Sequence, residues 1–241
     1  MTIRIAMWSG PRNISTAMMR SFGARADCAV SDEPFYGCFL KTTGERHPLA
    51  TETVADMDCD WHSVLRTQSS DPPRSEPIWY QKHMPHHMVG PVSIADMPDH
   101  RHAFLIRAPE RVVASYREKN ELREPAMLGF AQMRAYFDAE VGRTGVIPPV
   151  VDSDDILADP TGVLARLCDG LAIDWDPAML CWAMGPHAED GMWGQHWYDR
   201  VNASTGFAPA PGELPHLEGD HARVAEACRA DYEALRRYAL T

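Results

Sequence analysis

The sequence predicts an α/β fold in which a parallel sheet is flanked by helices on both faces. Short apolar runs alternate with stretches of helical spacing over most of the chain, as in strands joined by crossover helices. Two of these runs, at residues 3–8 and 102–106, lead directly into a tight loop and the first turns of a helix. Each loop carries an Arg and a hydroxyl near the start of that helix, so each predicts an anion site.

The N-terminal part begins with the apolar run at residues 3–8, which predicts a buried strand. Residues 13–23 follow with apolar side chains at helical spacing, and residues 28–31 form a second short strand. This succession is typical of a parallel pair of strands with its crossover helix.

A more polar stretch separates the second and third strands. A helix is expected to begin within residues 35–43. Residues 44–76 are polar, with Pro and Asp late in the segment, and predict a mobile insertion rather than core. Residues 77–83 restore the apolar pattern and predict a third strand.

The middle of the chain continues the alternation of strands and helices. Residues 102–106 predict a fourth strand, and Pro109 opens a helix at its first turn, where the missing N–H costs nothing. Residues 125–142 predict an amphipathic helix, residues 147–152 a fifth strand, and residues 160–170 another helix that begins with Pro.

The C-terminal third changes character. Residues 182–216 are rich in Trp, His, Gly and Pro and predict a long structured loop over the sheet, and residues 218–239 predict a closing helix. We expect one domain over residues 1–241, with lid or substrate-binding segments at 35–80 and 182–216.

The composition restricts the class of partner. The chain is 45% hydrophobic and 24% charged, with a formal net charge of −11. It has no basic surplus for nucleic acid or for an anionic membrane surface. No secretory signal or membrane-spanning run is visible, and the six Cys are scattered without a CxxC pair. These features predict a cytoplasmic protein with reduced thiols and no metal.

The loop SGPRNIST at residues 9–16 lies at the carboxyl end of the first strand, where parallel sheets bind ligands. Helix N–H groups there favour an anion, Arg12 adds a cation, and Ser15 and Thr16 add hydroxyl donors. The alternative is a plain strand–turn–helix unit capped by Ser. The loop lacks the second Gly and the Lys of GxxxxGK[ST], which disfavours an ordinary nucleoside triphosphatase.

The second loop places Arg107 at a strand end and Ser115 eight residues later, on the following helix. Eight residues are a little over two turns, so Ser115 can return to the face that Arg107 leaves from. Alone, each is unremarkable, as a surface charge and a helix-face filler. Beside the first loop, they predict a ligand with two phosphate-like ends.

Four segments, in order, resemble motifs of the sulfotransferases, which use 3′-phosphoadenosine 5′-phosphosulfate as donor. PRNIST at residues 11–16 is similar to the family's P-[RK]-S-G-T-T loop, and Arg107, Pro109 and Ser115 match R-x-P-x-x-x-x-x-S. YQKHMPHHM is similar to K-T-H-L-P. The segment VVDSDDILADPTGVLARLCDGLAID resembles the family's strand, (Y)EDLLADP and a helix ending in LCxFLGL.

The resemblance implies a P-loop-type fold and transfer of a sulfuryl group to a hydroxyl or amine of a small-molecule acceptor, without a metal. It implies that the first loop cradles the 5′-phosphosulfate through Arg12, Asn13, Ser15 and Thr16. Arg12 would also act in catalysis by neutralising the leaving phosphate. Arg107 and Ser115 would hold the 3′-phosphate.

The general base has two candidates. His83 is similar to the His of K-T-H-L-P and is preferred, because imidazole can accept a hydroxyl proton at neutral pH. Glu33, in SDEPFY after the second strand, is the competing base or acceptor anchor. The simpler alternative is that Glu33 pairs with a nearby Arg, such as Arg12, and orients it.

The sequence departs from the family pattern at several positions. Asn13 and Ile14 replace Ser-Gly, so the loop backbone is expected to differ and Ile14 to need an ordinary φ. Ser153 stands where many members have Tyr. Two alternatives stay open: a small-molecule kinase, with Asp32 as a tempting metal ligand, and a non-catalytic nucleotide-binding module.

Overall fold

The computed structural model describes residues 2–241, and its centre is one parallel sheet of five strands in the order β2-β3-β1-β4-β5. The strands are β1 (Ile3–Ser9), β2 (Cys28–Asp32), β3 (Ile78–His83), β4 (Arg101–Ile106) and β5 (Val150–Asp152). The predicted α/β class is confirmed, and each strand forms within two or three residues of its predicted position.

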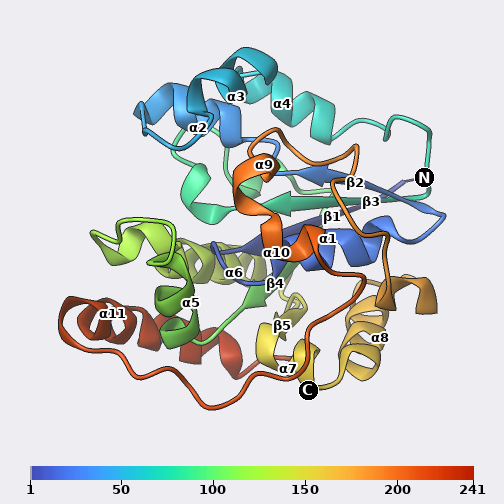
Figure 1. Ribbon diagram of the computed structural model, residues 1–241. Coiled ribbons are helices and arrows are strands. Elements are labelled where there is room, and N and C mark those ends of the chain that lie inside the picture. Colours follow the sequence, from blue (N-terminus) through green and yellow to red (C-terminus); the bar gives the residue numbers. More distant parts are fainter. Residues whose placement is uncertain (1) are drawn as a thin grey trace.

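Helices cover both faces of the sheet (Figure 1). The helices α1 (Ser15–Gly23) and α8 (Pro160–Gly170) pack on one face, and α6 (Phe130–Thr144) and α11 (Gly219–Arg236) pack on the other. The remaining helices are α2 (Tyr36–Thr43), α3 (Ala50–Asp56), α4 (Trp61–Gln68), α5 (Pro109–Tyr116), α7 (Ser153–Ala158), α9 (Gly194–Trp197) and α10 (Asp199–Asn202). Four 3-10 turns complete the list: η1 (Pro85–His87), η2 (Ile94–Asp96), η3 (Pro125–Leu128) and η4 (Pro177–Leu180).

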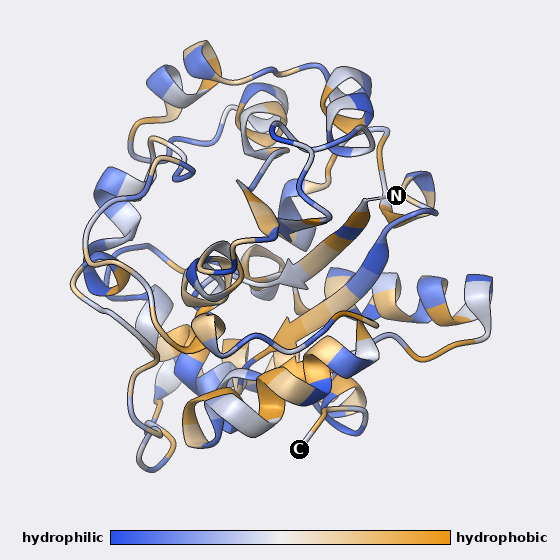
Figure 2. Ribbon diagram, turned by 90° about the vertical axis from the view of Figure 1, so that its right-hand side faces the viewer, coloured by the Kyte–Doolittle hydropathy of each residue, from blue (hydrophilic) through white to orange (hydrophobic). Residues whose placement is uncertain are grey.

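The strands are apolar because both of their faces are buried. In β1, Ile5 and Met7 join the core beside α1 and α8, whereas Ala6 and Trp8 join the core beside α6 and α11. Figure 2 shows this concentration of hydrophobic residues in the strands and in stretches of the helices. The same alternation places neighbouring side chains at the end of β3 on opposite faces of the sheet.

The polar stretch 44–76 differs from its prediction as an insertion outside the core. It contains α3 and α4, and Val64 of α4 is buried in the core that α6 also covers. The helical spacing within WHSVLRTQ turns Val64 and Gln68 inward, packs Trp61 and Leu65 partly against the core, and leaves His62, Arg66 and Thr67 exposed.

Two other predicted elements are shorter than their sequence patterns. The predicted helix at 125–142 is interrupted at Gly129, whose φ of +72° is left-handed, so that η3 ends there and α6 begins. The predicted strand at 147–152 is limited to β5, since two Pro residues precede it without N–H donors.

The strand order places a topological switch between β1 and β4. The helix after β1 packs on one face of the sheet, and α5 after β4 packs against α11, on the other side. A crevice therefore opens at the carboxyl ends of β1 and β4, the position where open α/β sheets bind ligands. Among residues 2–241, no helix has the length and apolar character needed to cross a membrane.

Candidate anion-binding and catalytic site

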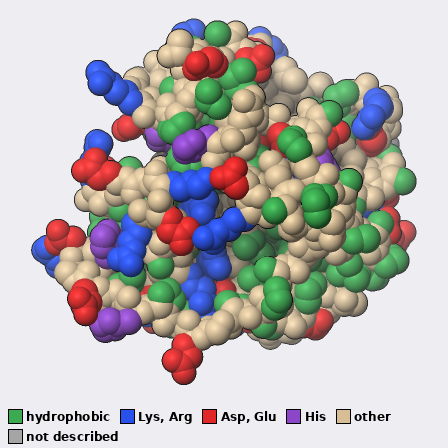
Figure 3. Space-filling view, viewed as in Figure 1, with side chains coloured by type: hydrophobic (Ala, Val, Ile, Leu, Met, Phe, Trp, Pro, Cys, Tyr) green, Lys and Arg blue, Asp and Glu red, His purple; other side chains and the backbone are tan. Residues whose placement is uncertain are grey.

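A cavity of about 370 Å³ lies at the carboxyl ends of the strands. The predicted site residues that line it are Arg12, Asn13, Ser15, Thr16, Glu33, Arg107 and Ser115. Figure 3 shows Lys and Arg side chains gathered in a band down the middle of the same face, with Asp and Glu among them. The chain is acidic overall, yet this face carries a local concentration of cations.

The first loop has an unusual backbone. Ile14 is the N-cap residue of α1 and has φ 54° and ψ 19°, in the left-handed region, and Arg12 has φ 62°. The expectation that Ile14 needs an ordinary φ is therefore wrong: Ile14 adopts the conformation that suits the Gly of the family pattern. A β-branched residue is strained in this region and persists only where the surroundings fix it.

Buried hydrogen bonds fix the first loop. The side-chain amide of Asn13 donates to the carbonyl oxygen of Leu105 over 3.1 Å. Ser153 Oγ lies 3.0 Å from the carbonyl oxygen of Asn13 and 2.8 Å from that of Ile106. The side chain of Asn13 thus braces the loop against β4, and Ser153 does the same from α7.

Helix α1 begins without a side-chain cap. The prediction's simpler alternative, a turn capped by Ser, is not what the structure contains. The bond from Met18 N to Ile14 O, 3.0 Å long, closes the first turn. The N–H groups that precede Met18 at the helix start have no intrahelical partner, which is the arrangement that favours an anion at a helix start.

The second loop joins the first. Arg12 Nε donates to Ser115 Oγ over 2.9 Å, and Arg107 Nη1 donates to the carbonyl oxygen of Arg12 over 2.8 Å. The structure therefore brings together both elements that the sequence singled out. Arg107 Nε is buried and has no hydrogen-bond partner, and its nearest carboxylate, Asp154, lies 3.8 Å away.

The two arginines lie in an environment that favours an anionic ligand. Burial lowers the pKa of Arg12, and the charge of Arg200 lowers it further. Burial also lowers the pKa of Arg107, with Arg111 and Arg12 adding to the effect and Asp154 opposing it. Each shift means that the charged form is short of compensation, which a bound anion would supply.

Glu33 lies at the other end of the cavity and pairs with a lysine that the sequence argument did not single out. Lys82 Nζ lies 2.5 Å from Glu33 Oε1, 2.8 Å from Asp32 Oδ1 and 2.7 Å from the hydroxyl of Tyr198. The suggested pairing of Glu33 with Arg12 does not occur, because Arg12 turns to Ser115 instead. Glu33 Oε2 lies 3.7 Å from His87 Nδ1.

His83 is placed away from the cavity. Successive side chains of a strand point to opposite faces, so Lys82 and His83 diverge at the end of β3. Lys82 lines the cavity, whereas His83 stacks on Trp8 with ring centroids 4.8 Å apart and is 1% exposed. Burial lowers the pKa of His83 well below its ordinary value. This geometry counts against His83 as the base and favours its competitor, Glu33.

Aromatic rings form the wall around Glu33. The ring of His87 stacks on both Tyr36 and Phe39, with its centroid 4.7 Å from each of theirs, and Trp193 meets Tyr36 edge-on at 5.0 Å. Burial lowers the pKa of His87 well below its ordinary value, so this ring is neutral at pH 7. Of these rings, Tyr36, His87 and Trp193 line the cavity.

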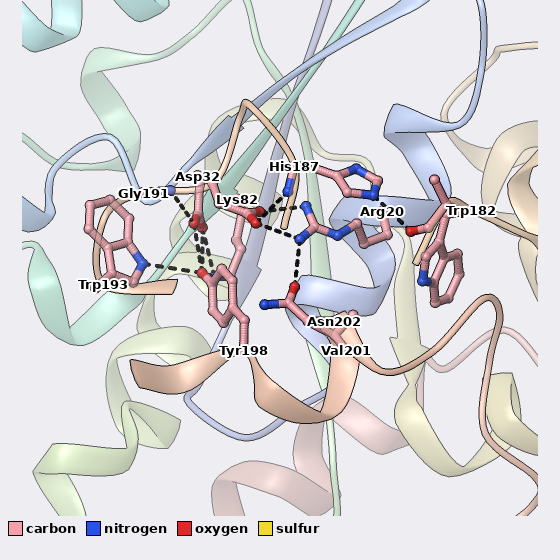
Figure 4. Close-up of polar contacts among 12 residues, drawn as sticks. Arg20, Asp32, Lys82, Trp182, His187, Gly191, Trp193, Tyr198, Val201 and Asn202 are labelled. Atoms are coloured by element: carbon pink, nitrogen blue, oxygen red, sulfur yellow. Dashed lines mark hydrogen bonds and ion pairs between the residues drawn. The ribbon is translucent and has the colours of Figure 1, made fainter. Parts of the chain in front are cut away.

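Two buried polar clusters hold the segment 182–216 over the sheet ends (Figure 4). Arg20 of α1 makes a bidentate pair with Asp190, at 2.5 and 2.6 Å, and donates to Asn202 over 3.2 Å. Asp32 accepts from the hydroxyl of Tyr198 and, over 3.1 Å, from the N–H of Gly191. The segment is thus attached at both α1 and β2.

The sequence predicts no metal, and Asp32 is the metal ligand that its kinase alternative would need. Among residues 2–241, no group of three or more His, Cys, Asp or Glu side chains is arranged to hold a metal ion. Asp32, the tempting metal ligand of the kinase alternative, is engaged instead by Lys82, Tyr198 and Gly191.

The chain matches known proteins over nearly its whole length. A family model described as a sulfotransferase domain covers residues 3–239. "Branched-chain-amino-acid aminotransferase-like protein 2" of Arabidopsis thaliana is 33% identical over 233 residues, which are 96% of this chain and 41% of that protein. Its relative, protein 1 of the same name and organism, is 35% identical over 88% of this chain and 37% of that protein. The chain spans about two fifths of the length of these relatives.

Solved structures share the fold at low identity. A sulfotransferase from Alicyclobacillus acidocaldarius is 14% identical, with a TM-score of 0.57 over 100% of this chain and 98% of that chain. The sulfotransferase domain of the olefin synthase of Synechococcus PCC 7002 is 18% identical, with a TM-score of 0.50 over 94% of each chain. The fold is that of sulfotransferase domains. By the family match, the chain belongs to the sulfotransferase family of enzymes.

Proposed function

We propose that the protein transfers a sulfuryl group from 3′-phosphoadenosine 5′-phosphosulfate to a hydroxyl or amine of a small-molecule acceptor. The observation that carries the proposal is the uncapped start of α1 between Arg12 and Arg107, at one end of a cavity that has Glu33 at the other. Family membership supports the reaction class.

The residues at the cationic end fit a donor with two anionic groups. The N–H groups at the start of α1, with Ser15 and Thr16, suit the 5′-phosphosulfate. The unpartnered Nε of Arg107 and the hydroxyl of Ser115 suit the 3′-phosphate. Arg12 belongs to the loop that leads into α1 and contacts Ser115 and Arg107, so it connects the two groups of donors.

The donor supplies the sulfuryl group and a leaving phosphate. The protein's own part is then to position the reactants and to stabilise charge, as in phosphoryl transfer. Arg12 and the N–H groups of α1 would neutralise the leaving phosphate. Glu33 would accept the proton of the acceptor group as general base.

The acceptor would occupy the end of the cavity near Glu33. Tyr36, His87 and Trp193 contribute rings to that end. These rings suit a small molecule with a flat apolar part, whose reactive hydroxyl or amine faces Glu33. The segments 35–80 and 182–216 supply most of this wall, in keeping with a substrate-binding role.

Calorimetry with adenosine 3′,5′-bisphosphate, compared with ATP and magnesium, tests the proposal. Preferential binding of the bisphosphate, together with sulfuryl transfer to members of an acceptor panel, is the expected result. Preference for ATP with magnesium would indicate the kinase alternative. Tight bisphosphate binding without transfer to any acceptor would indicate the non-catalytic module.

Replacement of Arg107 by Ala should selectively weaken the 3′-phosphate contact. We expect binding of adenosine 3′,5′-bisphosphate to weaken by about 1.5–3 kcal/mol, the range for a hydrogen bond to a charged group. Binding of adenosine 5′-monophosphate should barely change, because that ligand lacks the 3′-phosphate. Calorimetry on both ligands measures the difference. Arg111→Ala is a matched control, since Arg111 pairs with the same Asp154 but does not line the cavity. Equal losses for both ligands would remove the assignment.

A further inference from the structure

We propose that Lys82 is a positioning residue for Glu33, holding one oxygen of its carboxylate so that the other is free to accept a proton from the acceptor. This inference rests on the proposed function, in which Glu33 is the base. Neither the family motifs nor the sequence argument assigned Lys82 a role.

The contacts of Lys82 exclude a direct role toward a ligand. An ammonium group has three N–H donors. Asp32, Glu33 and Tyr198 lie 2.5–2.8 Å from Lys82 Nζ, and the side chain is 1% exposed. All three donors are therefore occupied by protein atoms, and Lys82 acts on the reaction through Glu33.

Lys82 holds Glu33 through both backbone and side chain. The N–H of Glu33 donates to the carbonyl oxygen of Lys82 over 3.0 Å, continuing the β2–β3 ladder in which Asp32 pairs with Lys82. Glu33 has φ 45°, in the left-handed region, which is costly for a residue with a side chain. The ladder and the 2.5 Å ion pair together maintain this conformation and the direction of the carboxylate.

The two oxygens of Glu33 have different surroundings. Oε1 is bound to Lys82 Nζ, whereas Oε2 has His87 Nδ1 at 3.7 Å. Burial lowers the pKa of His87 well below its ordinary value, so the imidazole does not neutralise the carboxylate at pH 7. Oε2 is thus the oxygen left for a proton, in a cavity with aromatic walls.

Lys82 also offsets the charge of the two carboxylates that it contacts, Asp32 and Glu33. The titratable and charged groups around Glu33 come from every neighbouring element: Asp32 from β2, Lys82 from β3, Tyr36 from α2, His47 from the α2–α3 connection, His87 from η1 and Tyr198 between α9 and α10. Lys82 is the cation among these groups at neutral pH. Its removal would leave two buried carboxylates side by side, which favours protonation of one of them.

The segment 182–216 completes the arrangement. The hydroxyl of Tyr198 accepts from Lys82 and from Trp193 Nε1, and donates to Asp32. Figure 4 shows these side chains converging from the strands and from the segment 182–216. Arg20, drawn in the same view, attaches the same segment through Asp190 but does not contact Glu33.

Variants that separate charge from geometry test the inference. Lys82→Met and Lys82→Gln both remove the positive charge. Gln keeps N–H donors, so Lys82→Gln serves as the test if the Lys82→Met variant does not fold. We expect both to move the acid limb of the kcat/KM pH profile upward by about 1–3 pH units, the effect of losing a close opposite charge. They should lower kcat at neutral pH and leave adenosine 3′,5′-bisphosphate binding within a few-fold of wild type.

Two controls accompany these variants: one keeps a positive charge at position 82, and the other removes a different buried cation. Lys82→Arg should retain the wild-type acid limb. Arg20→Gln removes a buried cation that attaches the segment 182–216 through Asp190, so it should loosen that segment without moving the acid limb. An unchanged acid limb in Lys82→Gln, or an equal shift in Arg20→Gln, would overturn the inference.

A readout that does not need turnover separates this inference from the proposed function. NMR with ¹³C-carboxyl-labelled Glu, assigned by comparison with Glu33→Gln, follows the titration of Glu33 directly. Its midpoint should move upward in Lys82→Gln relative to wild type. If wild type fails to bind the bisphosphate while this shift occurs, the proposed function fails but the contact stands. If the bisphosphate binds and no shift occurs, Lys82 does not control Glu33.

Discussion

Replacement of Glu33 by Gln is expected to reduce sulfuryl transfer by about 10²–10⁴-fold, the usual contribution of a general base. Gln keeps the size of the side chain and can still accept from Lys82, but its amide cannot take a proton at neutral pH. Binding of adenosine 3′,5′-bisphosphate should remain near wild type, because Glu33 lies at the other end of the cavity from Arg107. Single-turnover rates and calorimetry together measure the two effects.

The control is His83→Gln, at the position that the sequence alone favours for the base. Its ring packs on Trp8 outside the cavity, so a folded His83 variant should transfer the sulfuryl group at a rate within a few-fold of wild type. A fully active Glu33→Gln with an inactive, folded His83→Gln would show that the assignment from the structure is wrong.

Stability should fall steeply in mild acid because of buried histidines. Burial lowers the pKa values of His83, His86 and His87 well below 6.5, and that of His100 to about 4. In the unfolded chain these rings take up protons as the pH falls through about 6.5, whereas in the folded chain they stay neutral. The unfolded state therefore binds more protons, and the free energy of unfolding decreases as pH falls.

The size of this effect follows from linkage. Each histidine contributes about 1.4 kcal/mol per pH unit below about 6.5, so four give a slope of roughly 5 kcal/mol per pH unit. The raised pKa values of Asp32 and Asp152 oppose this with two groups, since burial makes the folded chain bind those protons more readily. Urea unfolding at pH 7.5, 6.5 and 5.5 measures the slope.

A single substitution checks the cause. His100→Gln should flatten the slope by about one proton, because it removes one buried imidazole whose environment includes the carbonyl oxygen of Gln68. Equal unfolding free energies at pH 7.5 and 5.5 would contradict the linkage argument.

The sequence predicted the parts of the site that depend on local pattern. Arg12 and Arg107 follow buried strands, and parallel strands bring such positions to one edge of the sheet. Their contacts with each other and with Ser115 agree with that reasoning. The roles of these residues toward each phosphate stay predictions.

The remaining parts depend on register and on distant segments. A shift of one position along β3 decides whether Lys82 or His83 faces the cavity, and a motif match is not sensitive to this. The alternation of the strand did carry this information. Ile78, Tyr80 and Lys82 occupy every second position and so share one face of β3, which is buried throughout. The contact of Lys82 with Tyr198 spans 116 positions and had no local signature.

Three cavity residues have a left-handed backbone conformation, and substitutions that stabilise the fold at these positions would be expected to lower activity. Arg12, Ile14 and Glu33 each occupy a conformation that costs on the order of 1–2 kcal/mol for an L-residue. A screen for thermostability alone would favour Gly or Asn at such positions, because relief of strain is among the cheapest gains available to a folded chain. The same exchange would make the backbone more flexible and would fix the orientation of the site's side chains and N–H groups less well. Engineering of the protein for thermostability should therefore leave these three residues unchanged.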